Sequence, residues 1–345
     1  MLFTMNRTHD CPFQKSFNKL MKKYKLVDQQ VKRLSNGTDY DYSEHTEDTA
    51  STGDFSTGSA QLLNVCEEDC MTGLRHYVAQ EGIQMSDQRL FRFASFHNFN
   101  LEKAKEAVDE NRDNAFLDLE MHGELRGQFV NKMLFPLPGL RTKKNKSQVI
   151  YGRPSRGNPE DDNMTNVLQS LCYVMNDFSQ TEQQCRDGVA LVTNLEGFKR
   201  EQFDEMEWRQ FILALQGTLV PTKVTTILLV NAPAWFKQEV WRKMRSSMPY
   251  QFRRNVHIVS SDKLGDYLME DYQAYLPHEI AHGYRSGAEI IEDYIDLKSY
   301  EDKQKRSSLL SSLIMPDVIT GVLLSYETCP TLGIKFQTGR NLTDD

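Results

Sequence analysis

The chain has 345 residues, of which 39% are hydrophobic and 10% aromatic, enough for one large domain or two modest ones. Its formal net charge of −7 excludes a general nucleic-acid binder, which needs a strong basic excess. The sequence has no apolar run long enough to cross a bilayer and no signal-peptide core at its start. We therefore expect a cytoplasmic protein whose six scattered cysteines stay reduced.

The first part of the chain divides into two regions. Residues 1–59 combine a basic amphipathic pattern over 13–34 with a polar, disordered linker. The amphipathic helix can lie on a membrane or dock on a partner, or it can simply close the domain with one face in solvent. Residues 60–125 are expected to form a small helical module in which Ser86 and Asn100 cap two of the helices.

The next region, residues 126–300, alternates short apolar runs with helical patterns. It opens with a loop-like segment that contains Pro136 and Pro138. Alternation of strands and helices predicts an α/β fold with a mainly parallel, helix-covered sheet. Residues 301–345 are left as a C-terminal extension. Strands are expected near 149–154, 188–198, 225–230 and 256–259, and helices over 164–178, 205–219 and 234–247.

The stretch from Thr225 to Met248 organises this domain. A buried strand ends at Pro233, which cannot donate to a sheet ladder, and the helix that follows repeats apolar residues four apart. These residues are Phe236, Val240 and Met244. Such a helix can wall an apolar cavity, so we expect it and the sheet to enclose an empty space. Ordinary core packing is the competing interpretation.

An enzyme alternative comes from His278-Glu279-Ile280-Ala281-His282, which matches H-E-x-x-H. On a helix, two histidines four apart bind zinc while the glutamate acts as general base. Pro277 immediately precedes the motif, and Ser286 stands where the extended motif needs a third histidine. No other catalytic motif is present. We therefore expect no catalytic residue, no metal and no cofactor, and keep a zinc metallopeptidase as an alternative.

Several motifs together resemble the CRAL-TRIO lipid-binding family, and in particular its retinaldehyde-binding and α-tocopherol transfer branch. The resemblance is carried by the strand from Ile227 to Pro233 with Trp235-Phe236, by Leu276-Pro277-His278-Glu279, and by Gly188 to Phe198. In the preceding module, Arg92-Phe93, Phe99, Leu101 and Ala104 match the family pattern. Asn194 replaces a common Asp, and Ala281 and His282 stand where two glycines are usual.

The resemblance implies a dry pocket for a hydrophobic or lipid-like ligand, held without covalent bonds. Strand alternation places three residues of one strand and two of the next on single faces. The family's pocket positions match these and further residues. With the helix stripe, the expected ligand-binding set is Val189, Leu191, Thr193, Phe198, Ile212, Leu215, Val220, Ile227, Leu229, Phe236, Val240 and Met244.

Delivery to a membrane is the second implication. Thr222 and Asn255 stand where phosphatidylinositol-transfer members have charged residues, so we expect those head-group contacts to be absent. Lys223 and Arg253 match positions that grip phosphoinositides, and Arg254 lies beside them. We expect a peripheral protein that carries lipid between membranes, gated by helix 234–247. A non-enzymatic signalling scaffold with a vestigial pocket is the remaining alternative.

Overall fold

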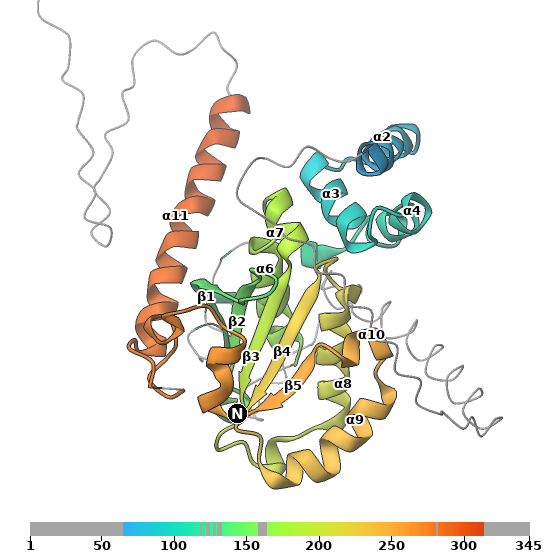
Figure 1. The fold of residues 1–345 in the computed structure, drawn as a ribbon. Coiled ribbons are helices and arrows are strands. Elements are labelled where there is room, and N and C mark those ends of the chain that lie inside the picture. The colour runs from blue at the N-terminus through green and yellow to red at the C-terminus, as the bar shows by residue number, and fades with distance from the viewer. Residues whose placement is uncertain are drawn as a thin grey trace, which may run out of the picture.

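The computed structural model describes residues 65–117, 133–157, 164–280 and 282–313, together with 119, 121, 125, 126 and 129. The basic helix expected over 13–34, the linker after it and the residues from 314 onward lie outside this part of the chain. The described part contains an N-terminal helical module, a five-stranded sheet with helices between its strands, and a long helix after the last strand (Figure 1).

The sheet confirms the predicted α/β fold. Its strands follow one another in space as they do in the sequence, from β1 to β5. β1 is antiparallel to β2, and the other neighbours are parallel. The strands are β1 (Leu134–Arg141), β2 (Gln148–Gly152), β3 (Val189–Asn194), β4 (Val224–Val230) and β5 (Val256–Val259).

β1 corrects the sequence analysis, which expected a loop there. Pro136 pairs with Ile150 in an antiparallel edge strand, where a missing amide hydrogen is tolerated. The register then shifts between Leu137 and Arg141. Gly139, with a φ of 88°, lies within that irregularity. The two prolines thus mark an edge strand with a bulge.

Three crossover connections place their helices on one face of the sheet, because β2 to β5 are parallel, sequential neighbours and such crossovers are right-handed. The crossover helices are α6 (Met164–Asp177) with the short α7 (Glu182–Asp187), then α8 (Glu205–Leu213), then the helix over 234–247. We call the last one the gate helix. It contains the π-helical turn η5 (Phe236–Trp241) and α9 (Arg242–Ser247), and α10 (Tyr250–Arg253) follows it.

The helix predicted over 205–219 changes form at Ala214. Residues Ala214–Thr218 make the π-helical turn η4, in which Gly217 has a φ of 82°. A Cβ at Gly217 would lie 2.1 Å from Cζ of Phe96 in α3. Gly217 thus adopts a left-handed conformation that favours glycine, and a larger residue would clash with Phe96 of the N-terminal module.

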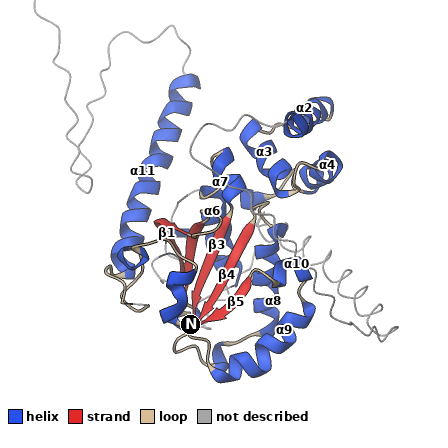
Figure 2. Cartoon of the chain, in the orientation of Figure 1, coloured by secondary structure: helices blue, strands red, loops and turns tan. Residues whose placement is uncertain are grey.

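The opposite face and the β1 edge are covered by residues that follow β5. The 3₁₀ turns η6 (Ser261–Asp266) and η7 (Tyr272–Ala274) lead into α11 (Gly287–Leu313), which runs along the β1 side (Figure 2). The ring of His257 in β5 lies 5.1 Å from that of Tyr267. α11 continues through residue 300, where the sequence analysis began a separate extension.

The N-terminal module consists of α2 (Val65–Gln80), α3 (Asp87–Phe96) and α4 (Leu101–Glu110). Both predicted caps are confirmed: the Ser86 side chain accepts a hydrogen bond from the amide of Arg89, and that of Asn100 from the amide of Lys103. Short 3₁₀ turns complete the described elements, namely η1 (Ala115–Leu117), η2 (Pro154–Arg156) and η3 (Arg200–Gln202).

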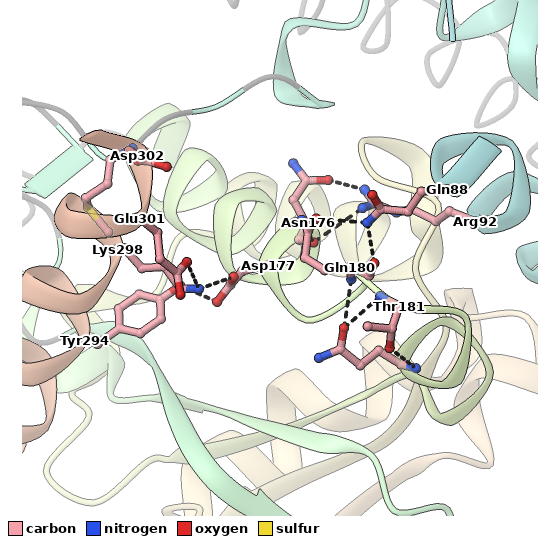
Figure 3. Close-up of polar contacts among 12 residues, drawn as sticks. Gln88, Arg92, Asn176, Asp177, Gln180, Thr181, Tyr294, Lys298, Glu301 and Asp302 are labelled. Carbon is pink, nitrogen blue, oxygen red and sulfur yellow. Dashed lines mark hydrogen bonds and ion pairs between the residues drawn. The ribbon is translucent and has the colours of Figure 1, made fainter. Parts of the chain in front are cut away.

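The carboxyl end of α6 joins three parts of the molecule (Figure 3). Arg92 of α3 is buried, and its Nη1 donates to Oδ1 of Asn176 at 2.5 Å. Nη2 of Arg92 donates to the carbonyl of Ser179 at 3.1 Å. The next residue, Asp177, forms an ion pair with Lys298 of α11. The carboxyl end of α6 is thereby anchored to α3 on one side and to α11 on the other.

Candidate functional site

The helix-covered face of the sheet carries the strand residues that the sequence analysis assigned to a pocket. In the parallel register, Leu191 lies beside Ile227 and Thr193 beside Leu229. Partners in register on adjacent strands point to the same face. Gly152 of β2 lies on the other side of Thr193 and leaves room next to its hydroxyl. This row at the carboxyl ends of the strands forms one wall of a cavity.

The cavity has a volume of about 120 Å³ and lies between these strand ends, the amino end of α6, and α8. Ligands of open parallel sheets commonly bind at this edge, outside the carboxyl ends of the strands. Most of the lining is apolar. It consists of Met133, Leu134, Gly152, Pro154, Gly157, Met164, Val167, Thr193, Phe198, Gln202, Glu207, Trp208 and Phe211.

Three polar residues line the cavity, namely Thr193, Gln202 and Glu207, and they differ in whether their side chains already make hydrogen bonds. The Gln202 amide donates to the carbonyls of Ser155 and Gly157, at 3.4 and 3.3 Å, and so holds the wall together. Glu207 belongs to the first turn of α8, and its carboxylate has no hydrogen bond to a described residue. Burial, and then the nearby Asp204 carboxylate, raise the pKa of Glu207.

Beside the cavity, aromatic rings fill much of the space between α8 and the gate helix. Trp208 lies 5.9 Å from Phe198 and 5.6 Å from Phe236, measured between ring centroids. Trp235 lies 5.7 Å from Phe198, and Phe203 packs against both tryptophans. The empty space expected directly under the gate helix is therefore occupied by what we call the aromatic cluster: Phe198, Phe203, Trp208, Trp235 and Phe236.

A second cleft, of about 260 Å³, lies on the outer side of this cluster, where α8 meets the gate helix. Its floor is apolar, but its rim is charged: Arg200 contacts Glu239, and Arg209 pairs with Glu205 at 2.9 Å. The Arg200–Glu239 contact joins the turn after β3 to the gate helix. The lining residues are Arg200, Phe203, Glu205, Arg209, Trp235, Glu239, Val240, Lys243 and Met244.

The structure divides the expected ligand-binding set among three places. Thr193 and Phe198 line the cavity, and Val240 and Met244 line the second cleft. The remaining eight pack in the interior of the helix-covered sheet without lining either space; they are Val189, Leu191, Ile212, Leu215, Val220, Ile227, Leu229 and Phe236.

The α6 residues of the cavity wall were not in the expected set, and neither were Trp208 and Phe211. Their only sequence signal was apolar spacing on two helices. Met164 and Val167 lie three apart on α6, and Trp208 and Phe211 three apart on α8.

The expected docking residues lie at the amino ends of the strands, whereas the cavity lies at the carboxyl ends. Lys223 immediately precedes β4, and Arg253 and Arg254 precede β5, its parallel neighbour. Lys223 is half-buried, and burial followed by repulsion from Arg186 lowers the pKa of its ammonium group. Arg253 lies 5.5 Å from the ring centroid of the exposed Tyr250.

The segment with the H-E-x-x-H pattern is not a helix. His278 and Glu279 form a turn, and His282 has a φ of 55°, so the two histidines are not presented one helical turn apart. Nδ1 of His278 lies 2.8 Å from the carbonyl oxygen of Gly283, and Glu279 pairs with Arg153 at 3.1 Å. Within the described residues, no group of three potential ligands is arranged to hold a metal ion.

A mainly parallel sheet with an apolar cavity at the carboxyl ends of its strands is an arrangement that suits binding of a small apolar ligand. Residues 134–280 match the family model described as CRAL/TRIO domain. Domains of this family bind hydrophobic, lipid-like molecules in general and are typically not enzymes. The match supports the predicted CRAL-TRIO family for this region and does not distinguish the retinaldehyde and tocopherol branch.

Other comparisons add the following findings. The solved structure titled "Crystal structure of Sfh5" is similar with a TM-score of 0.45 and 14% identity, covering 68% of this chain and 99% of that one. No curated protein matches the chain. No helix of the described residues is both long and apolar enough to cross a membrane.

Proposed function

We propose that this protein binds a hydrophobic, lipid-like ligand through its CRAL/TRIO domain and carries it between membranes. The supporting observation is the apolar cavity of about 120 Å³ at the carboxyl ends of β2 and β3, bordered by the aromatic cluster. Burial of apolar surface, at ~25 cal/mol per Å², supplies the affinity. Reactive groups are not needed for this task.

The size of the cavity implies that the ligand enlarges it. A cavity of ~150 Å³ holds a molecule no larger than benzene, so about 120 Å³ admits one end of a lipid but not its whole chain. The aromatic cluster, which includes Trp235 and Phe236 of the gate helix, borders this space. In the proposed mechanism the gate helix moves outward with Phe236, and the ligand then contacts Leu191, Ile227 and Leu229 on the sheet.

In this proposal, contact with a membrane surface drives the movement of the gate helix. Its outer side exposes Lys237, Arg242 and Arg245, which favour an anionic surface, while Trp241 is half-buried and available to the interface. We further propose that Lys223, Arg253 and Arg254 dock on phosphoinositide head groups, as in the retinaldehyde and tocopherol branch. An anionic phosphate would offset the repulsion between Lys223 and Arg186.

The binding step is tested by native mass spectrometry of the full chain purified from cells, with lipid extraction of the same sample. We expect a bound lipid that is lost on denaturation. The transfer step is tested with donor and acceptor liposomes. Phe236→Asp with Val240→Asp should change release strongly, because both side chains are buried under the gate helix, whereas Gln238→Asp on its exposed side should not. Unchanged release in the double variant would reject the gate.

The scaffold with a vestigial pocket is the second candidate function, and the small cavity is the observation that favours it. It makes a different prediction for the same two experiments. The protein would carry no lipid after purification and would transfer none, while remaining folded and bound to membranes or partners.

A further inference from the structure

The polar groups of the cavity are unlike those expected for an anionic ligand. Of the residues that the structure describes, thirteen line it, and among these thirteen Glu207 is acidic and none is basic. Among the described arginines close to lining residues in the sequence, Arg153 pairs with Glu279, Arg200 contacts Glu239, and Arg156 is exposed. A ligand phosphate or carboxylate placed here would meet the like charge of Glu207 in a partly enclosed space, which is unfavourable.

Two acceptors remain for a ligand to use. The Glu207 carboxylate has neither a hydrogen bond nor an ion pair with a described residue, and the Thr193 hydroxyl faces the cavity at the end of β3. An ionised carboxylate only accepts hydrogen bonds, and a hydroxyl can also accept. The complement of this pair is therefore a donor. Burial raises the pKa of Glu207, and a donor or cation beside it would reverse that shift.

A structural role for Glu207 alone does not explain its position. An acidic residue in the first turn of a helix is favourable for the helix dipole, and Glu205 supplies the same benefit. Glu205, however, is exposed, pairs with Arg209 and lines the second cleft. The two carboxylates therefore form a matched pair in one turn of α8, one directed to the cavity and one to solvent.

From this geometry we infer that the end of the ligand held beside Glu207 and Thr193 carries a hydrogen-bond donor, as in a long-chain alcohol or amine, and no negative charge. The inference rests on the proposed function and names its ligand class. An anionic head group, if the ligand has one, lies outside this cavity.

The test compares tetradecanol, tetradecylamine and tetradecanoate, which share one chain length and differ in the head group. Binding to the full chain is measured by calorimetry at about neutral pH. We expect the alcohol and the amine to bind at least about tenfold more tightly than the carboxylate. Glu207→Gln should weaken the amine and strengthen the carboxylate, each by about tenfold, and change the alcohol little.

Controls separate the ligand contact from helix stability. Glu205→Gln removes the same charge from the same turn and should leave all three affinities unchanged. Glutamine is also favourable at this position of a helix, so Glu207→Gln is expected to fold, and circular dichroism verifies it. Thr193→Val, read independently, should weaken the alcohol several-fold.

Each other result has a definite meaning. The inference fails if tetradecanoate binds as tightly as the amine, or if Glu207→Gln leaves their affinity ratio unchanged, and the proposed function survives either result. If none of the three probes binds and the purified protein carries no lipid, the inference and the proposed function fail together.

Discussion

Lys298 places its Nζ 2.6 Å from Oδ1 of Asp177, and this contact ties α11 to the carboxyl end of α6 (Figure 3). Both side chains are mostly buried, with exposed fractions of 13% and 15%. The hydroxyl of Tyr294 donates to the other oxygen of Asp177 at 3.0 Å. Asp177 is thus satisfied by two groups of a single helix.

Removing the lysine should leave a buried carboxylate without its cation. We expect Lys298→Met to lower the free energy of unfolding by about 3 kcal/mol, measured by urea denaturation. Glu301→Gln removes only the exposed partner of the same lysine and should cost less than about 1 kcal/mol. Equal losses of unfolding free energy in the two variants would show that the buried ion pair does not stabilise the fold more than the exposed one.

Arg92 should fix the N-terminal helical module to the domain that contains the sheet, through the geometry of its hydrogen bonds as well as through its charge. Arg92→Lys keeps the charge but cannot reach Asn176 and the Ser179 carbonyl together. We expect a loss of about 2 kcal/mol in unfolding free energy and faster hydrogen exchange in α3. The exposed Arg75, paired with Asp87, is the control, and Arg75→Lys should have little effect.

Stability should decrease in mild acid because of His257. Burial lowers its pKa below the ordinary value of about 6.5. The unfolded chain therefore binds more protons than the folded protein as pH falls through about 6.5, and folding stability is lost in that range. At about one pH unit below 6.5, the loss is at most about 1.4 kcal/mol for this histidine.

The measurement compares the wild type with His257→Gln by urea denaturation at about pH 6.5 and at about one pH unit below it. The variant should lose less stability on acidification than the wild type. His97, whose pKa is lowered by burial and then by Lys103, contributes in the same direction and remains in both proteins. Identical pH dependence in the two proteins would contradict the assignment.

Docking on phosphoinositide should depend on the cations at the amino edge of the sheet. Lys223→Glu and Arg254→Glu are each expected to weaken binding to phosphoinositide liposomes by about 1 kcal/mol or more, less so at high salt. Lys199→Glu makes the same charge change at the carboxyl ends of the strands, in the turn after β3. An equal effect of Lys199→Glu would indicate attraction by overall charge instead of this edge.

Filling the cavity should separate ligand binding from folding. Val167→Phe adds volume on the α6 wall, and we expect it to displace the ligand while changing the unfolding free energy by less than about 1.5 kcal/mol. Native mass spectrometry reads the bound ligand. Gln169→Phe adds the same ring to α6 away from the cavity and should retain the ligand; retention in both variants would place the ligand elsewhere.

Local chemistry made much of the fold predictable. β3 is buried along its whole length and β4 over its last four residues, and both contain the apolar runs that are typical of strands covered on both faces. Ser86 and Asn100 cap helices in the way their side chains favour. β1 escaped prediction because Pro136 and Pro138 indicate a loop unless the position of the strand at a sheet edge is known.

The site was predictable only in part, because its shape depends on tertiary packing. Alternation placed Thr193 on the correct face, but it could not show that Trp208 and Phe203 would occupy the space beneath the gate helix. The same limit applies to Glu207. Its residue type is ordinary for the first turn of a helix, and only the position of α8 against β3 gives it a cavity to face.

The prolines of β1 also bear on how this protein behaves at high concentration. An outermost strand offers unpaired amide and carbonyl groups to other chains, which promotes aggregation. Pro136 has no amide hydrogen, and the irregularity around Gly139 bends the chain away from a flat strand. This border of the sheet is therefore a poor template for further β-pairing, and the domain is protected there from growth by addition of strands from other molecules.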